Sequence, residues 1–249
     1  MFARLQYLLL QMRNADDPMR AAEVRSFART LEVPEDRIRV FDLLTGFPSR
    51  QQLENIDVVL LGGSGDYSAT DDGAWIEPIL DGLRGLCAQA KPTFASCWGF
   101  QAMARAMGGL VVHDASRAEI GTLELQLTPA GAEDAVFGAL PATFTGQAGH
   151  EDCVDRLPSG ATLLASSEKV AHQAYCLDGL PIYCTQFHPE LSRDDLLERL
   201  RAYPRYVERI AGMTLEEFAH RCGETAPAAA LLRRFVAHVF DIETKDDAH

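Results

Sequence analysis

Short apolar runs alternate along the N-terminal part of the chain with segments in which apolar side chains recur every three or four positions. The runs have the length of buried strands, and the recurring pattern is typical of helices with one buried face. The predicted strands are Leu5–Gln11, Arg37–Leu44 and Ile56–Leu61, and the predicted helices are Met19–Leu31 and Trp75–Ala90. Strands that alternate with helices predict a parallel sheet covered by helices on both faces.

The pattern changes in the middle of the chain, where strands are predicted without long helices between them. Apolar positions alternate in Gly121–Thr128, and Gly160–Ser166 is a second apolar run. Further on, Tyr175-Cys176 and Ile182–Cys184 flank Asp178-Gly179, a pair of residues that favours the tight turn of a hairpin. These segments predict a small antiparallel element, either inserted into the sheet or at its edge.

The C-terminal part shows helical patterns only. A first helix is predicted over Asp194–Tyr203, and Thr214 begins a Thr-x-x-Glu sequence that is typical of the start of a helix. Pro227 suits the first position of a last helix, because the missing N–H of proline is not needed there. We therefore expect one domain over residues 1–192 and a helical extension over residues 193–249 that packs on the same domain.

The acidic composition narrows the choice of partners. The 249 residues carry a net charge of −13, which disfavours nucleic acid and anionic membranes as partners. No apolar run reaches the length of a membrane span, and Leu5–Met12 lacks the small-residue cleavage pattern of a signal peptide. The six cysteines are too sparse for a disulfide scaffold, so we expect a reduced, cytoplasmic protein.

Cys97 has the surroundings of a reactive thiol. A short apolar run ends at Cys97, small residues flank the thiol, and a helical run over Phe100–Met107 follows at once. A strand, a sharp turn and a helix in this order form a nucleophile elbow. The attacking species is the thiolate, and the dipole of the following helix favours it.

Two further segments supply the groups that a cysteine nucleophile needs. His188 can act as the base, and Glu190 can orient its imidazole by accepting the proton on the other ring nitrogen. Gly62-Gly63, Cys97 and His188 each follow a predicted strand. In a doubly wound sheet such positions meet at one edge, so we expect these segments to form one site.

A tetrahedral oxyanion would require hydrogen-bond donors at this site. The backbone N–H of Trp98, directly after the nucleophile, and that of Gly63 are the candidates. Each residue also has a structural interpretation that the pattern alone leaves open. Cys97 and His188 could be packed core residues, Glu190 could be an acid at a helix N-terminus, and Gly62-Gly63 could be a tight turn.

Three segments together resemble the class I glutamine amidotransferases. The run Ser96–Gln101 is similar to the family pattern Gly-x-Cys-x-Gly-x-Gln, Gly62-Gly63 to its oxyanion loop, and Gln186–Glu190 to its His-Pro-Glu signature. The segments Glu119–Gly121 and His150–Asp152 resemble the subset that contains the amidotransferase domain of GMP synthase. The resemblance covers about residues 4–192, in the order found in the family.

The resemblance implies a flavodoxin-like three-layer α/β sandwich with a mostly parallel sheet. It also implies hydrolysis of the glutamine side-chain amide through a γ-glutamyl thioester, which gives glutamate and ammonia for a synthase partner, with no cofactor. Cys97 would be the nucleophile, His188 the base and acid, and Glu190 the orienting group. Gly63 and Trp98 would form the oxyanion hole, and Gln101 would contact the substrate.

Two departures and two alternative functions accompany this resemblance. Ala95 replaces the first glycine of the elbow, which is expected to crowd the turn, and Ser64-Gly65 replaces the proline common after the oxyanion loop. Because no synthetase domain is recognisable, the chain could instead be a stand-alone γ-glutamyl hydrolase with the same triad. A catalytically silent binding module is the third possibility.

Three minor interpretations complete the sequence analysis. Gln101 could be a solvated helix residue, and the segment His150–Asp152 could cap a loop or bind a partner. A metal site formed by Cys176, Cys184 and His188 is not expected, because their spacing fits no common zinc pattern.

Overall fold

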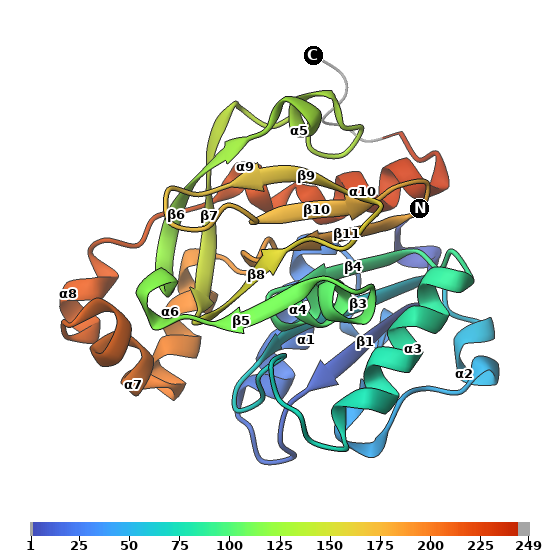
Figure 1. Ribbon diagram of the computed structural model, residues 1–249, viewed down its shortest axis with the longest axis horizontal. Coiled ribbons are helices and arrows are strands. Elements are labelled where there is room, and N and C mark those ends of the chain that lie inside the picture. Colours follow the sequence, from blue (N-terminus) through green and yellow to red (C-terminus); the bar gives the residue numbers. More distant parts are fainter. Residues whose placement is uncertain (1, 244–249) are drawn as a thin grey trace.

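The computed structural model describes residues 2–243 of the chain. Its main feature is a nine-stranded sheet (Figure 1). The strand order is β2-β1-β3-β4-β11-β10-β9-β6-β7, and β5 and β8 form a separate antiparallel pair. The strands are β1 (Tyr7–Met12), β2 (Ile38–Asp42), β3 (Val58–Ser64), β4 (Thr93–Ser96), β5 (Leu110–His113), β6 (Glu119–Leu127), β7 (Thr143–His150), β8 (Asp152–Arg156), β9 (Ala161–Ser166), β10 (Ala174–Leu177) and β11 (Ile182–Thr185).

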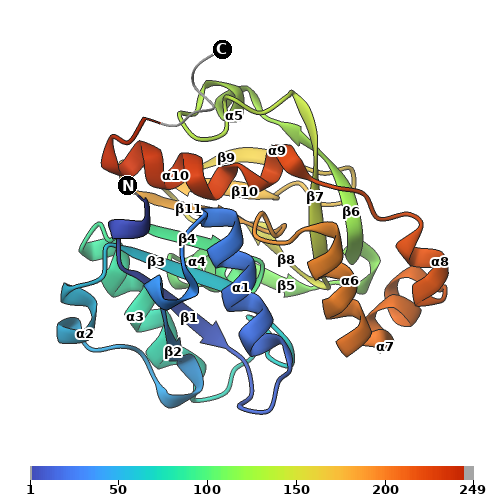
Figure 2. The same ribbon diagram turned by 180° about the vertical axis from the view of Figure 1, so that it is seen from behind.

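The helices cover both faces of this sheet. They are α1 (Met19–Leu31), α2 (Arg50–Glu54), α3 (Ile76–Ala88), α4 (Trp98–Ala106), α5 (Pro129–Glu133), α6 (Arg193–Ala202), α7 (Pro204–Tyr206), α8 (Leu215–Ala219), α9 (Ala226–Ala229) and α10 (Leu231–Phe240). A π-helical segment, Val207–Ala211, continues directly from α7. Helices α3 and α4 lie on one face (Figure 1), and α1 and α10 lie on the other (Figure 2).

The sheet has a parallel half and an antiparallel half. Strands β2, β1, β3, β4 and β11 run parallel to their neighbours, whereas β10, β9, β6 and β7 continue the sheet with antiparallel pairing. The expected α/β fold class, with a parallel central sheet and an antiparallel element, is confirmed. The antiparallel element both extends the central sheet and includes the separate β5–β8 pair.

Alternate residues of the buried strands face two hydrophobic cores. In β1, Leu8 and Leu10 pack with α3 and α4, while Tyr7 and Leu9 pack with α1 and α10. Strand β3 divides its side chains in the same way. Successive side chains point to opposite faces of a strand, so a strand covered on both faces is apolar throughout, as the sequence of β1 is.

The last helix belongs to the main core. Leu231, Leu232, Phe235 and Val236 of α10 are fully buried in the same cluster as residues of β1 and β3. The predicted last helix is divided, however, since α9 ends at Ala229 and α10 begins at Leu231.

A predicted hairpin and a predicted helix start can also be compared with the structure. The hairpin around Asp178-Gly179 is confirmed, with Tyr175 paired to Cys184 in antiparallel register. Thr214 caps α8 through a full capping box with Glu217, as its spacing predicts. Within residues 2–243, no helix has the length and apolarity needed to cross a membrane.

Candidate functional site

Cys97 lies in a sharp turn between β4 and α4. Its backbone has φ 53° and ψ −107°, a conformation that side chains other than glycine rarely adopt and that stores strain. Gly99 lets α4 approach the sheet, because a Cβ there would lie 2.5 Å from the Cβ of Leu61 and 3.2 Å from that of Ala95. Ala95 itself is fully buried, and the turn forms in its presence.

His188 follows β11, which is the parallel neighbour of β4. Thr185 of β11 pairs with Ser96 of β4, and the backbone N–H of Cys97 donates to the carbonyl of Thr185 at 2.8 Å. The two segments therefore leave the same edge of the sheet side by side. The structure brings Cys97 and His188 together in this way, and both line one small enclosed chamber.

Glu190 holds the imidazole of His188 from the side opposite the chamber. Its Oε1 lies 2.5 Å from Nδ1 of His188 and also accepts a hydrogen bond from the hydroxyl of Ser96 at 3.2 Å. Glu190 is fully buried, and helix α6 is capped by Ser192 instead. Its side chain therefore serves the histidine and does not cap a helix.

The two buried groups shift each other's proton affinity. Burial lowers the pKa of His188, but the carboxylate of Glu190 outweighs it and raises that pKa above its ordinary value. Burial raises the pKa of Glu190, but His188 lowers it further, so the carboxyl remains ionised. The charge of Cys97, and after it a hydrogen bond, also raises the pKa of His188, while the sulfur itself lies 3.9 Å from the carbonyl oxygen of Gly149.

The paired glycines form the end of β3 rather than a turn. A Cβ on Gly63 would lie 3.0 Å from Cε1 of His188, so only glycine leaves room for the imidazole. A Cβ on Gly62 would lie 2.2 Å from Oε1 of Glu23. The two glycines thus let the backbone pass between a buried carboxylate and the histidine. Trp98, the other predicted oxyanion donor, is the first residue of α4.

Gln101 is buried, in contrast to the solvated alternative. Its Nε2 donates to the carbonyl of Asp152 at 2.8 Å and to Oε1 of Gln186 at 3.0 Å. It lines a cavity of about 500 Å³ that Cys97 also lines. The amide of Gln101 therefore ties α4 to the start of β8, and its contact with substrate stays a prediction.

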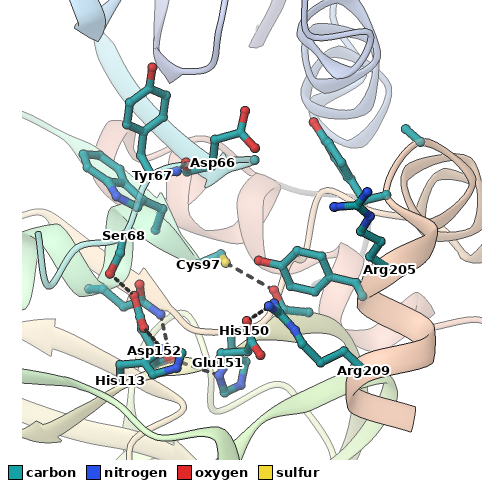
Figure 3. A pocket seen from close by; sticks show the side chains of 18 of the residues that line it. Asp66, Tyr67, Ser68, Cys97, His113, His150, Glu151, Asp152, Arg205 and Arg209 are labelled. Atoms are coloured by element: carbon teal, nitrogen blue, oxygen red, sulfur yellow. Dashed lines mark hydrogen bonds and ion pairs between the residues drawn. The ribbon is translucent and has the colours of Figure 1, made fainter. Parts of the chain in front are cut away.

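His150 and Asp152 form a wall of this cavity that adjoins the loop after β3. Nε2 of His150 lies 3.2 Å from the carboxylate of Glu119, and its Nδ1 lies 3.1 Å from the carbonyl of Asp152. The carboxylate of Asp152 accepts a hydrogen bond from Ser68 at 2.5 Å and lies 2.9 Å from Nδ1 of His113 (Figure 3). These contacts connect three separate segments, so the wall is held from both sides.

The C-terminal extension supplies the remaining wall, which sequence reasoning missed. Figure 3 shows Arg205 and Arg209 reaching from the helical ribbon toward the cavity, and Arg209 forms an ion pair with Glu151. Arg199 and Tyr203 line the small chamber beside Cys97 and His188. Spacing in the sequence could not show this wall, because α6 ends at Ala202 and α7 begins at Pro204, so the chain changes direction between Arg199 and Tyr206.

A buried ion pair anchors this wall to the sheet. Arg13 is 1% exposed, and its guanidinium contacts Glu23 at 3.2 Å and Asp17 at 3.0 Å. The hydroxyl of Tyr203 donates to Asp17 at 2.7 Å and accepts from Arg13 at 3.2 Å. The loop after β1 is thereby connected to the extension directly beside the chamber.

Cys176 and Cys184 do not gather around His188. Cys184 packs in the core against α3 and α4, whereas Cys176 contacts the core on the opposite face. Among residues 2–243 no group of three or more His, Cys, Asp or Glu side chains could hold a metal ion.

Comparison with known proteins agrees with this geometry. The model of the family "Glutamine amidotransferase class-I" matches residues 28–196. Gamma-glutamyl peptidase 3 of Arabidopsis thaliana is 28% identical over 209 residues, which are 82% of this chain and 80% of that protein. One component of the glutamine-hydrolyzing GMP synthase of Sulfolobus acidocaldarius is 30% identical over 152 residues, 61% of this chain and 77% of that protein.

Solved structures show the same fold. A glutamine amidotransferase from Thermotoga maritima superposes with a TM-score of 0.75 at 19% identity and covers 96% of this chain and 99% of its own. The match of the family model over most of the chain shows that this protein belongs to the class-I glutamine amidotransferase family.

Proposed function

We propose that this protein hydrolyses a γ-glutamyl amide bond through a cysteinyl thioester, with Cys97, His188 and Glu190 as its triad. The observation that carries the proposal is the joint placement of these three side chains at the ends of the adjacent parallel strands β4 and β11. A thiol, a base within reach of it and a carboxylate on the far ring nitrogen form the arrangement that nucleophilic amide hydrolysis requires.

The reaction begins when Nε2 of His188 takes the thiol proton and the sulfur of Cys97 attacks the γ-carbonyl carbon. The carbonyl oxygen becomes an oxyanion, and the backbone N–H groups of Gly63 and Trp98 are its proposed donors. His188 then gives its proton to the leaving nitrogen, and the C–N bond breaks to leave the thioester. Water hydrolyses the thioester with His188 again acting as base.

Two kinds of leaving group are supported. The cavity of about 500 Å³ falls in the range of sites for ligands larger than a single amino acid, and the extension closes one side of it. This supports a γ-glutamyl compound with a larger amine, as does the similarity to gamma-glutamyl peptidases over 82% of the chain. The similarity to the GMP synthase of Sulfolobus acidocaldarius supports the second candidate, glutamine, whose ammonia would pass to a synthase partner.

Glutamate release by the purified chain tests these candidates. The substrates are a γ-glutamyl dipeptide and glutamine, and the isomeric α-glutamyl dipeptide is the control. Release from the γ-glutamyl dipeptide supports a stand-alone hydrolase, and release from glutamine alone, increased by a synthase, supports an amidotransferase. No release from either, together with no labelling of Cys97 by a glutamine-analogue electrophile, would overturn the proposal in favour of a silent binding module.

Replacement of Glu190 by glutamine tests how the base is oriented. We expect the rate to fall roughly 10⁴-fold, and less than the roughly 10⁶-fold loss for His188→Ala, because the amide can neither fix the tautomer nor stabilise the imidazolium. The pKa of His188 should fall, since the carboxylate that raises it is gone. Turnover of both variants, and NMR titration of His188 in the Glu190→Gln protein, measure these effects.

The same variant has a defined effect on stability. The pKa of His188 is higher in the folded protein than in the unfolded chain, so protonation of His188 stabilises the fold. This stabilisation is fully present at a pH below the unfolded pKa, about 6.5, and is lost as the pH rises through the folded pKa. Glu190→Gln should remove this dependence on pH. A greater loss of rate for Glu190→Gln than for His188→Ala would contradict the assigned roles.

A further inference from the structure

Arg199 lies where the base and the predicted oxyanion loop meet. Its Nη1 is 3.1 Å from Nε2 of His188, the nitrogen that faces the chamber shared with Cys97. The same Nη1 would be 3.4 Å from a Cβ placed on Gly63. A guanidinium group therefore occupies the space next to both the proton acceptor and one of the two predicted oxyanion donors.

Arg199 forms no direct ion pair with a carboxylate among the described residues, although its charge reaches Glu190 and lowers the pKa of that carboxyl. Its hydrogen bond is to the imidazole, although other arginines nearby are paired, as Arg29 is with Asp195 and Arg25 with Glu198. The side chain is half-buried in the wall of the chamber, so solvent only partly compensates its charge. A cation in this position is suited to a negative charge that forms during the reaction.

We propose that Arg199 is a catalytic residue whose guanidinium stabilises the tetrahedral oxyanion, together with the backbone N–H groups of Gly63 and Trp98. This inference rests on the proposed hydrolysis of a γ-glutamyl amide. It adds a charged donor to an oxyanion hole that the sequence resemblance assigns to backbone groups alone.

The contact with His188 explains how this donor is coupled to proton transfer. A guanidinium has only donors, so its hydrogen bond to Nε2 requires the neutral imidazole, whose proton is on Nδ1 and is donated to Glu190. Arg199 favours this neutral form, because its charge lowers the pKa of His188 against the opposite effect of Glu190. When the thiol proton moves to Nε2 of His188, it takes the lone pair that had accepted the hydrogen bond from Arg199, and Nη1 of Arg199 is released. In the same step the S–C bond forms and the carbonyl oxygen becomes negative, so Nη1 turns from Nε2 to the oxyanion.

The intermediate then collapses with the reverse change. The proton on Nε2 passes to the leaving nitrogen, the C–N bond breaks, and the oxygen returns to a neutral carbonyl. Nε2 regains its lone pair and Arg199 can donate to it again. Arg199 is thus charged throughout and changes only its acceptor.

Kinetics of Arg199→Gln test the proposal, with whichever γ-glutamyl amide the wild-type protein hydrolyses. We expect kcat to fall roughly 100- to 1000-fold with little change in KM, because the lost contact forms only with the oxyanion. Arg199→Lys should recover part of kcat. Arg201→Gln, on the exposed side of the same helix, is the matched control and should retain wild-type turnover. An unchanged kcat, or an increase that marks Arg199 as a resting-state block, would overturn the proposal.

Alkylation of Cys97 by iodoacetamide separates this role from a merely structural one. Alkylation needs the thiolate but forms no oxyanion, so its rate, followed by mass spectrometry across a range of pH, should change less than tenfold in Arg199→Gln. A fall equal to that of kcat would assign Arg199 to the thiol or the base instead, against the proposal. A wild-type protein inactive on every γ-glutamyl amide defeats the proposed function itself, whereas an active wild type with an equally active Arg199→Gln defeats only this inference.

Discussion

Replacement of Cys97 by alanine is expected to reduce turnover roughly 10⁶-fold, to the background rate. The thiol forms the bond to the substrate carbonyl, and neither His188 nor the oxyanion donors can substitute for it. The free energy of unfolding should change by no more than about 1 kcal/mol, because only one sulfur atom is removed. Glutamate release and urea-induced unfolding measure the two effects.

Replacement of Cys97 by glycine gives a second variant that isolates the strain of the turn. Glycine accepts the φ of 53° without cost, so Cys97→Gly should be more stable than Cys97→Ala by about 1 kcal/mol while equally inactive. The comparison measures how much stability the protein loses by holding its nucleophile in this conformation. Wild-type turnover in either variant would contradict the role of Cys97.

Replacement of Arg13 by methionine is expected to destabilise the protein by about 3–5 kcal/mol. The change leaves the carboxylate of Glu23 buried without a cation, and the remaining hydrogen bond from Gln11 at 2.9 Å cannot compensate its charge. Arg25→Met is the matched control, since Arg25 pairs with Glu198 at a site about half exposed, where such pairs contribute about 1 kcal/mol or less. Urea-induced unfolding compares the two variants.

Two further measurements check the physical cause of this loss. Arg13→Met combined with Glu23→Gln should recover part of the stability, because no buried charge then lacks a partner. Burial raises the pKa of Asp17, but Tyr203, the N–H of Met19 and Arg13 outweigh it and lower that pKa. The ionised carboxyl of Asp17 therefore stabilises the fold at a pH above its unfolded pKa, about 3.9, and this stabilisation is lost as the pH falls through its folded pKa. Equal losses of stability for Arg13→Met and Arg25→Met would contradict the prediction.

The central strands of the parallel half were predictable because they are buried along their whole length, unlike the edge strand β2. Strands such as β1 and β3 are buried on both faces, so their sequences are continuous apolar runs of strand length. The site followed from these strands, since residues after parallel strands meet at one edge. The structure places Cys97, His188 and Gly63 together there, as expected, although their catalytic roles stay predictions.

In the antiparallel half, β6, β9 and β10 were predicted, but β7 was not, because its sequence is polar and rich in glycine. Strand β7, Thr143–His150, contains two glycines and a buried Gln147, and its pairing with β6 forms through the backbone. Nothing in its sequence alternates strongly between apolar and polar side chains. The cavity wall from the extension was missed for another reason, since Arg199 acts through contacts that depend on tertiary packing.

The π-helical segment Val207–Ala211 has a consequence for the wall of the cavity. Its hydrogen bonds span five residues instead of four, so removal of one residue would restore α-helical spacing and rotate the side chains that follow by about 100°. Arg209 lies within it, next to the cavity. Deletion of a single codon here would therefore change which side chain lines the cavity, while Cys97 and His188, which follow β4 and β11, keep their positions.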